Sequence, residues 1–285
     1  MKYVFFGTPR FAANTLAQVL EQNLPPAAAV CNSDRPVGRK KIITAPPVKQ
    51  LIIRYNATHP EPIPVFQPDT LDENFLKQLA KYSPDFFVVV AYAKILPKPV
   101  INLPPRGTLG LHPSLLPKLR GASPIQSAIL TGETETGVSL YQLDDRMDHG
   151  PVLMQARLPM SAPEPYLQIE SKLAGLAGEL LVKILKTPFA AWPQPQAQDE
   201  TAATYTKKFE SDDGLVQAAD LAAALKGDSA QTNLIYRKIC ALNPEPGAWT
   251  VLNGERTKLL QAEIKNNRLI LTLTQRAGRT AQRLN

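Results

Sequence analysis

The stretch Gly107–Arg120, GTLGLHPSLLPKLR, decides the fold. It begins as a short apolar strand, and Pro113 ends that strand directly after His112 because proline has no N–H for the sheet. We therefore predict a strand over Thr108–His112 with His112 at its carboxyl end. Ligands of open α/β sheets bind outside the carboxyl ends of the strands, so His112 has the position of a functional residue.

A second stretch, Asp144–Gly150 (DDRMDHG), has the same relation to its own strand. It follows the apolar run Val138–Leu143 and so places Asp148 beyond the carboxyl end of another strand. A histidine and an aspartate at that edge would form a general-base pair in which the carboxylate orients the imidazole. The alternative is that His112 is an ordinary strand-end residue and Asp148 an ordinary loop aspartate.

Upstream of this stretch, strand and helix patterns alternate. Lys2–Phe6 predicts a buried strand, Thr8 and Pro9 suit the start of a helix, and Ala27–Cys31 predicts a second strand. Asp85–Tyr92 has the continuous apolar run of a central parallel strand. We predict an α/β fold with a Rossmann-like, mostly parallel sheet. The first turn lacks the GxGxxG pattern, so a dinucleotide site is not expected.

A change of composition suggests two domains. Residues 188–202, PFAAWPQPQAQDETA, are rich in proline, alanine and glutamine and predict a linker. We therefore predict a catalytic domain over residues 1–187 and a second domain over residues 203–285. The second domain carries short strand patterns and one clear helix pattern, Asn233–Leu242, which predicts a small β-barrel like an oligonucleotide-binding fold.

Composition narrows the class of protein. The 285 residues are 44% hydrophobic and 20% charged, and no 18-residue apolar run is present, so no membrane helix is expected. The two cysteines, Cys31 and Cys240, lie far apart, which favours a reducing cytoplasm over a disulfide framework. The three histidines lack the spacing of metal ligands, so no metal site is expected.

The chain is basic, with a net charge of +7, and residues 203–285 carry twelve Lys and Arg against eight Asp and Glu. A second basic region is Asn32–Pro47, where prolines and glycine predict a long irregular loop. One reading is a solvated surface loop; the other is a functional loop whose cations contact phosphate.

Several motifs together resemble one enzyme family. His112-Pro-Ser-Leu-Leu-Pro117, the later Arg120-Gly121 and Met147-Asp148-x-Gly150 resemble the folate-dependent formyltransferases. Further motifs resemble the methionyl-tRNA formyltransferase branch of that family. They are Gly7-Thr8-Pro9-x-Phe11-Ala12, the basic segment from Arg35 to Lys41, Phe66-Gln67-Pro68, Val89–Tyr92, Asp213-Gly214 and Ala241-Leu242-Asn243-Pro244-x-Pro246-Gly247-Ala248.

The resemblance implies an enzyme that transfers the formyl group of 10-formyltetrahydrofolate, without a metal, to the amino group of methionyl-initiator tRNA during translation initiation. His112 and Asp148 would be catalytic. The remaining assignments follow the same resemblance: folate contacts by Ser114, Leu115, Leu116, Pro117, Val90 and Tyr92; tRNA contacts by Arg39, Lys40, Lys41, Lys207, Lys208 and Arg237. Because the partner is a large polyanion, we expect a monomer.

One residue departs from the family pattern G-x-x-N-x-H. Gly110 stands where the catalytic asparagine belongs, and losing an oxyanion donor of this kind costs about 100- to 1,000-fold in rate. Either another group fills the space, or the enzyme is slow, or the chain is a catalytically impaired tRNA-binding homologue. A sugar-nucleotide or other small-amine N-formyltransferase is a further alternative. If the space is empty, Gly110→Asn should preserve or raise activity.

Overall fold

The computed structural model describes residues 1–38 and 40–284, which form two compact units. The first unit comprises Met1–Arg120, Gly137–Arg157 and Ser171–Thr204. The second comprises Gly121–Thr136, Leu158–Glu170 and the chain from Tyr205 onward. Neither unit is one continuous segment, because the middle of the chain contributes to both.

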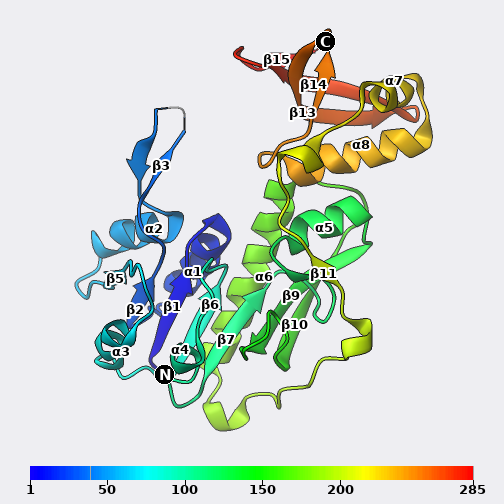
Figure 1. Cartoon of the computed structure of the whole chain (residues 1–285). Coiled ribbons are helices and arrows are strands. Elements are labelled where there is room, and N and C mark those ends of the chain that lie inside the picture. The colour runs from blue at the N-terminus through cyan, green and yellow to red at the C-terminus, as the bar shows by residue number, and fades with distance from the viewer. Residues whose placement is uncertain (39, 285) are drawn as a thin grey trace. The chain divides into compact units, whose positions relative to one another are not determined.

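A seven-stranded sheet forms the centre of the first unit (Figure 1), in the order β10-β9-β7-β6-β1-β2-β5. The five strands from β7 to β5 pair in parallel, as the alternation of strands and helices predicts. β9 pairs with β7 in the antiparallel direction. The strands are β1 (Tyr3–Gly7), β2 (Ala28–Val30), β5 (Val65–Phe66), β6 (Phe86–Val90), β7 (Thr108–His112), β9 (Glu135–Gln142) and β10 (Val152–Pro159).

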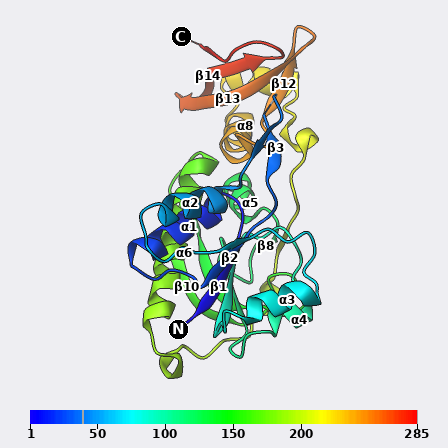
Figure 2. The ribbon, with the colours of Figure 1, turned by 90° about the vertical axis from the view of Figure 1, so that its left-hand side faces the viewer.

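Helices cover both faces of this sheet. Figure 2 shows α1 and α6 on one side of β1 and β2, and α3 and α4 on the other. Strand residues that alternate toward one face, such as Val4 and Phe6, are fully buried with Leu79 of α3 in one apolar cluster. The helices are α1 (Arg10–Glu21), α2 (Pro47–Asn56), α3 (Glu73–Ala80), α4 (Lys98–Ile101) and α6 (Tyr166–Lys186).

The basic segment is not the irregular loop that its prolines and glycine predict. β3 (Arg35–Val37) and β4 (Ile42–Thr44) pair as an antiparallel hairpin. β-Branched residues favour strand pairing, and Gly38 takes a positive φ of 70° at the turn, which glycine adopts without strain. The prediction of irregular structure was therefore wrong for these two short strands.

The second unit is built on antiparallel strands, as expected. β12 (Trp249–Leu252), β13 (Glu255–Lys265), β14 (Arg268–Arg276) and β15 (Gln282–Arg283) pair in that order. Leu259 and Leu269 of this sheet are buried with Leu221 of α7 and Ile235 of α8. The helices here are α5 (Pro124–Thr131), α7 (Ala218–Lys226) and α8 (Ser229–Leu242). The remaining elements are the paired strands β8 (Arg120–Gly121) and β11 (Tyr205–Thr206), and the short turns η1 (Phe189–Ala191), η2 (Glu200–Ala202) and η3 (Ser211–Gly214).

Among residues 1–38 and 40–284, no helix is both long and apolar enough to cross a membrane. In the same part of the chain, no group of three or more His, Cys, Asp and Glu side chains is arranged to hold a metal ion.

Candidate active site

The parallel strands bring the predicted site residues to one edge of the sheet. Gly7 at the end of β1 pairs with Val90 at the end of β6, and Val90 pairs with Leu111 of β7. His112 is therefore the last residue of β7 at the carboxyl edge of three neighbouring strands. Only 7% of its surface is exposed.

Asp148 reaches this edge by a different route from the one predicted. Because β9 is antiparallel to β7, its last residue, Gln142, lies beside Leu109 at the opposite end of that strand. The carboxyl end of β9 therefore does not coincide with that of β7. The loop after β9 returns along the strand, and the Tyr141 hydroxyl donates a hydrogen bond to Asp148 Oδ1 over 2.7 Å.

His112 and Asp148 form the predicted pair. His112 Nδ1 lies 3.5 Å from Asp148 Oδ2, within ion-pair reach but longer than a good hydrogen bond. The other ring nitrogen, Nε2, lies 2.9 Å from the carbonyl oxygen of Leu119. A carbonyl can only accept, so Nε2 carries a proton and donates it. Both nitrogens thus face oxygen atoms, which fixes the plane of the ring.

The loop that carries Asp148 is held from the segment that we expected to be a linker. Asp148 has a positive φ of 50°, a conformation that aspartate tolerates better than most residues. Gln198 Nε2 donates to the carbonyl oxygens of Asp148 and Gly150, over 2.9 and 2.7 Å. Residues 188–202 therefore help to build the site.

A network of charged side chains lies beside Gln198. The Arg120 side chain, 1% exposed, donates to both carboxylate oxygens of Glu200 and also to Gln198 Oε1. The Arg120 hydrogen bond lowers the pKa of Glu200 below its ordinary value, so the pair stays ionised. His149 is half-buried between Asp144 Oδ2 at 2.5 Å and Glu200 Oε1 at 3.3 Å.

The space beside Gly110 is filled. Gly110 pairs with Tyr141 across β7 and β9, so a side chain at 110 and the Tyr141 ring would share one face of the sheet. A Cβ atom on Gly110 would lie 2.6 Å from Tyr141 Cζ and 2.5 Å from Leu143 Cδ1. Such distances are far inside van der Waals contact. Glycine is therefore required here by the close approach of the tyrosine ring.

Sequence reasoning missed Tyr141, Gln198 and the Arg120–Glu200 pair. A glycine inside a buried strand is itself a signal, because it often marks close approach of another group. The strand pattern did not say which residue approaches Gly110, since that depends on the register between β7 and β9.

The predicted folate turn, Ser114–Pro117, is rigidly held. The Ser114 hydroxyl is buried and donates to the carbonyl oxygen of Lys118 over 2.6 Å. Ser139 of β9 accepts from the Leu116 amide over 3.0 Å and donates to the Ser114 carbonyl over 2.7 Å. Leu115 and Pro117 are half-buried, whereas Leu116 is buried. The Ser114 side chain thus stabilises the turn from within.

Val90 and Tyr92 lie at the end of β6, as predicted. Val90 is fully buried, and the Tyr92 ring packs edge-on against Phe6. Burial raises the pKa of Tyr92 to about 12, so its hydroxyl stays protonated. That hydroxyl is buried without a hydrogen-bond partner among the described residues.

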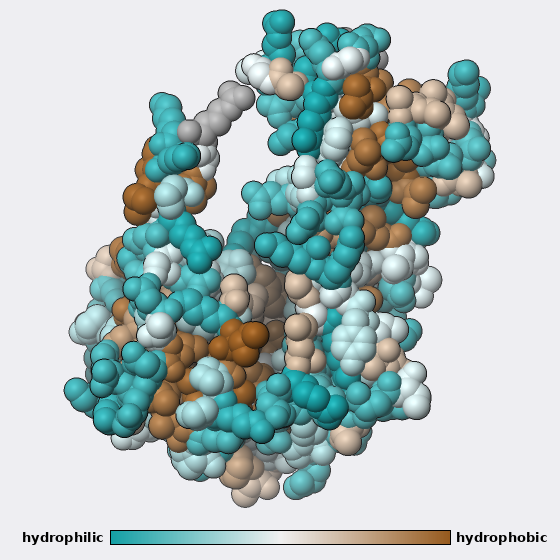
Figure 3. Space-filling view, viewed as in Figure 1, coloured by the Kyte–Doolittle hydropathy of each residue, from teal (hydrophilic) through white to brown (hydrophobic). Residues whose placement is uncertain are grey.

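The predicted tRNA-contact residues differ in their surroundings. Lys40 and Lys41 are exposed on the β3–β4 hairpin, and Arg39 lies outside the described residues. Val37, Ile42 and Ile43 of the hairpin are 57 to 64% exposed, so its surface mixes basic and apolar side chains (Figure 3). In the second unit Lys208 is exposed, Lys207 pairs with Asp213, and Arg237 donates to the Thr131 carbonyl over 3.4 Å at the end of α5.

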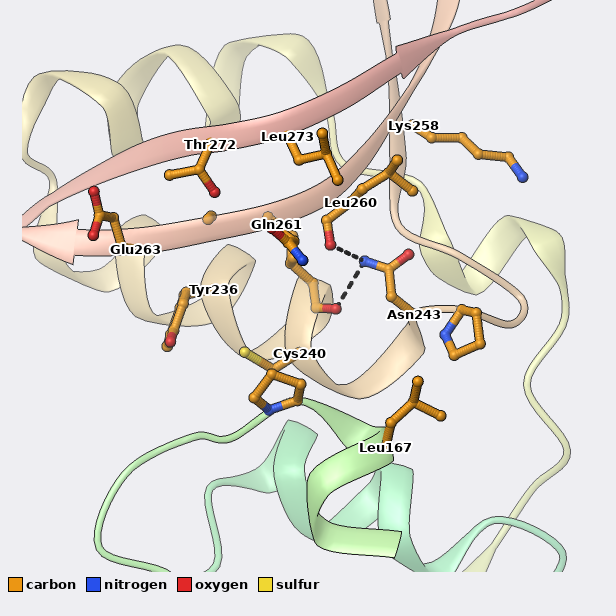
Figure 4. A pocket seen from close by; sticks show the side chains of 14 residues that line it. Leu167, Tyr236, Cys240, Asn243, Lys258, Leu260, Gln261, Glu263, Thr272 and Leu273 are labelled. Carbon is orange, nitrogen blue, oxygen red and sulfur yellow. Dashed lines mark hydrogen bonds between the residues drawn. The ribbon is translucent and has the colours of Figure 1, made fainter. Parts of the chain in front are cut away.

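A cavity of about 600 Å³ lies in the second unit. Figure 4 shows Tyr236 and Cys240 of α8 facing Gln261 and Leu273 of the sheet, with Asn243 donating to the Leu260 carbonyl. None of the predicted catalytic or folate-contacting residues lines this cavity.

The fold and site together define a class: an α/β protein with a histidine–aspartate centre at the carboxyl edge of a mostly parallel sheet, followed by an antiparallel domain. The family model "Formyl transferase" matches residues 1–185, and "Formyl transferase, C-terminal domain" matches residues 229–282. The chain belongs to the formyl transferase family, as the motifs around His112 indicate.

Individual relatives agree with this assignment. A protein named methionyl-tRNA formyltransferase from Syntrophus aciditrophicus is 36% identical over 260 residues, which is 91% of this chain and 78% of that protein. The solved structure of methionyl-tRNA formyltransferase from Clostridium thermocellum covers all of this chain with a TM-score of 0.59 at 17% identity. HypX from Aquifex aeolicus in complex with tetrahydrofolic acid gives a TM-score of 0.66, also at 17% identity, and this chain covers 46% of it. The two structures show the fold.

Proposed function

We propose that this chain transfers the formyl group of 10-formyltetrahydrofolate to the α-amino group of methionine on initiator tRNA. The observation that carries the proposal is the His112–Asp148 pair at the end of β7, in a chain 36% identical over most of its length to a protein named methionyl-tRNA formyltransferase. The antiparallel domain and the basic hairpin supply surfaces for a large anionic substrate. We further propose that the enzyme acts as a cytoplasmic monomer.

The reaction sets the tasks of the site. The methionine amine attacks the formyl carbon, and the resulting tetrahedral species carries an oxyanion and an ammonium. The new C–N bond remains, the bond from the formyl carbon to N10 of the folate breaks, and the proton lost by the amine ends on N10. The site must therefore stabilise an oxyanion and move one proton, without forming a covalent bond to the protein.

The residues present fit these tasks. In the protein without substrate, His112 Nε2–H donates to the Leu119 carbonyl and Nδ1 faces Asp148. When substrate binds, the Nε2–H would turn from Leu119 to the oxyanion, while Asp148 keeps hold of the other ring nitrogen. Asp148 balances a positive charge on the imidazole and accepts the amine proton. The rigid turn Ser114–Pro117 and the residues Val90 and Tyr92, which lie at the end of β6, would hold the folate.

For the tRNA we propose contacts by Lys40 and Lys41, with Arg39 between Gly38 and Lys40, and by Lys208. Lys207 and Arg237 already have partners within the second unit, so we expect them to contribute less. Contacts of this kind go to phosphate, which positions the substrate and makes binding weaker as salt rises.

The direct test incubates purified protein with 10-formyltetrahydrofolate and methionyl-initiator tRNA, and follows N-formylmethionine after deacylation. We expect multiple turnovers with this acceptor and no turnover with a sugar nucleotide that bears a free amine. Turnover with the sugar nucleotide alone would contradict the proposal. Tight tRNA binding without any formyl product would indicate a binding protein instead.

A further inference from the structure

Gly110 stands where the family pattern has an asparagine, and the ring of Tyr141 packs against it from the neighbouring strand. We propose that Tyr141 is a positioning residue of this active site. Its ring fills the place of the missing side chain, and its hydroxyl orients Asp148 against His112. This inference rests on the proposed formyl transfer and deepens it, because it concerns how the same centre works without an amide at position 110.

The first observation is steric. Tyr141 Cζ would be 2.6 Å from a Cβ atom at position 110, so no side chain longer than hydrogen fits there while the ring keeps its place. Only 6% of Tyr141 is exposed, which fixes the ring between β7 and the loop that follows β9. The same packing leaves no room for an ordered water at the position of the asparagine Cβ.

The second observation is the direction of the hydroxyl. Tyr141 Oη is one bond beyond Cζ and donates to Asp148 Oδ1 over 2.7 Å, while Asp148 Oδ2 faces His112 Nδ1. The three side chains thus form a series from β9 through the loop to the end of β7. A hydrogen bond to an ionised group is among the stronger ones, and it holds the carboxylate in one orientation.

The third observation is the protonation of the phenol. Burial first, and then the nearby Asp148 carboxylate, raises the pKa of Tyr141 well above its ordinary value of 10.0. The phenol therefore remains a neutral donor at every pH at which the enzyme works. It has one O–H proton, which Asp148 already accepts, so the same hydroxyl is not a second donor to the oxyanion. Tyr141 acts through Asp148 and His112.

Removing the hydroxyl alone gives the sharpest test. Tyr141→Phe keeps the ring beside Gly110, and we expect kcat for methionyl-tRNA to fall about 10- to 100-fold with both KM values within a factor of two. The kcat–pH profile should change as well, because the carboxylate that faces His112 loses one of its hydrogen-bond donors. The charged groups around this carboxylate, His112, Asp144, Arg146, His149 and Glu200, are unchanged in the variant.

Substitutions at positions 110 and 141 test whether the tyrosine ring excludes a side chain at position 110. Gly110→Asn alone should lose at least about 100-fold in kcat, because the new side chain collides with the tyrosine ring. Gly110→Asn combined with Tyr141→Met should be more active than either single variant, since methionine is flexible enough to leave room for the amide. Thermal melting of each variant shows whether it is folded.

The outcomes separate this inference from the proposed function. Failure of the unchanged protein to formylate methionyl-tRNA would overturn the proposed substrate. A wild-type protein that is active, with Tyr141→Phe equal to it in kcat and pH profile, would overturn only the positioning role. A Gly110→Asn variant as active as the unchanged protein, or a double variant no better than Gly110→Asn, would overturn the paired replacement. Should Gly110→Asn fail to fold, Tyr141→Phe still decides the positioning role.

Discussion

The His112 centre and the β3–β4 hairpin are built in opposite ways. His112 is 7% exposed. Hydrogen bonds join the segments around it, because Tyr141 of β9 donates to the Asp148 side chain and Gln198 donates to the Asp148 backbone. The hairpin exposes Ile43 by 64% and is joined to the rest of its unit mainly at its base, where Lys49 and Gln67 donate to Asp34. Proton transfer needs fixed geometry, whereas a surface that meets a flexible polyanion gains from side chains that can adjust.

If the buried centre carries the chemistry, removing its imidazole should have the largest effect. His112→Ala should lower kcat at least about 1,000-fold while tRNA binding stays within a factor of two, because the ring donates to the developing oxyanion. The measurement is formylation under saturating substrates, with tRNA binding followed separately. His59→Ala is the matched control, since His59 is an exposed ring stacked on Tyr55 far along the chain. Equal activity of both variants would remove His112 from the mechanism.

The cross-links around the centre should matter next. Gln198→Ala removes two hydrogen bonds to the backbone of the Asp148 loop, so kcat should fall about 10-fold through misplacement of the carboxylate. Gln196→Ala, two residues away in the same segment, should have little effect, because the hydrogen bonds between Gln196 and Val152 are made by the backbone and remain in the variant. If both variants behave alike, the clamp on Asp148 has no catalytic role.

The exposed hairpin should respond to salt and leave kcat unchanged. Lys40→Ala with Lys41→Ala should raise KM for tRNA several-fold and reduce the slope of log affinity against log salt by about 2. The control, Lys77→Ala with Lys81→Ala, removes the same charge from exposed positions on and just after α3. A fall in kcat, or an equal change in the control, would contradict a phosphate-contacting hairpin.

The smallest effect concerns the base of the hairpin. Hydrogen bonds from Gln67 and then Lys49 lower the pKa of Asp34 below its ordinary value of 3.8. A carboxyl whose pKa is lower in the folded state adds stability above its unfolded pKa and loses it as pH falls through the folded pKa. Asp34→Asn should therefore lower Tm slightly at pH 7, with the difference shrinking as pH falls below about 3.8 and gone once the pH is below the folded pKa. A Tm difference that persists below the folded pKa would mean that packing, and not the charge of Asp34, causes it.

Gly110 shows how a sequence can point to a change without explaining it. The family pattern identifies the missing amide, and an empty space there predicted that Gly110→Asn would preserve or raise activity. The structure shows that the space is not empty, because the Tyr141 ring already fills it. Nothing in the chain around Gly110 names Tyr141, which lies 31 positions downstream, and the register of β9 on β7 is needed to pair them.

The hairpin gives the opposite lesson. Its charge was evident from Lys40 and Lys41, but prolines and glycine suggested an irregular loop. The strands are only three residues each, too short for alternation to be recognised in one sequence.

The sequence by itself determined the strand that ends at His112, the mostly parallel sheet and the family, and it singled out His112 and Asp148, which the structure brings within 3.5 Å of each other. These depend on local patterns and short motifs, which lie in adjacent residues. Only the tertiary structure decided that β9 runs antiparallel to β7, that Gln198 clamps the Asp148 loop, and that a tyrosine ring fills the place of the family's amide. Those features depend on contacts between residues 31 to 50 positions apart, and strand register and loop path set such contacts.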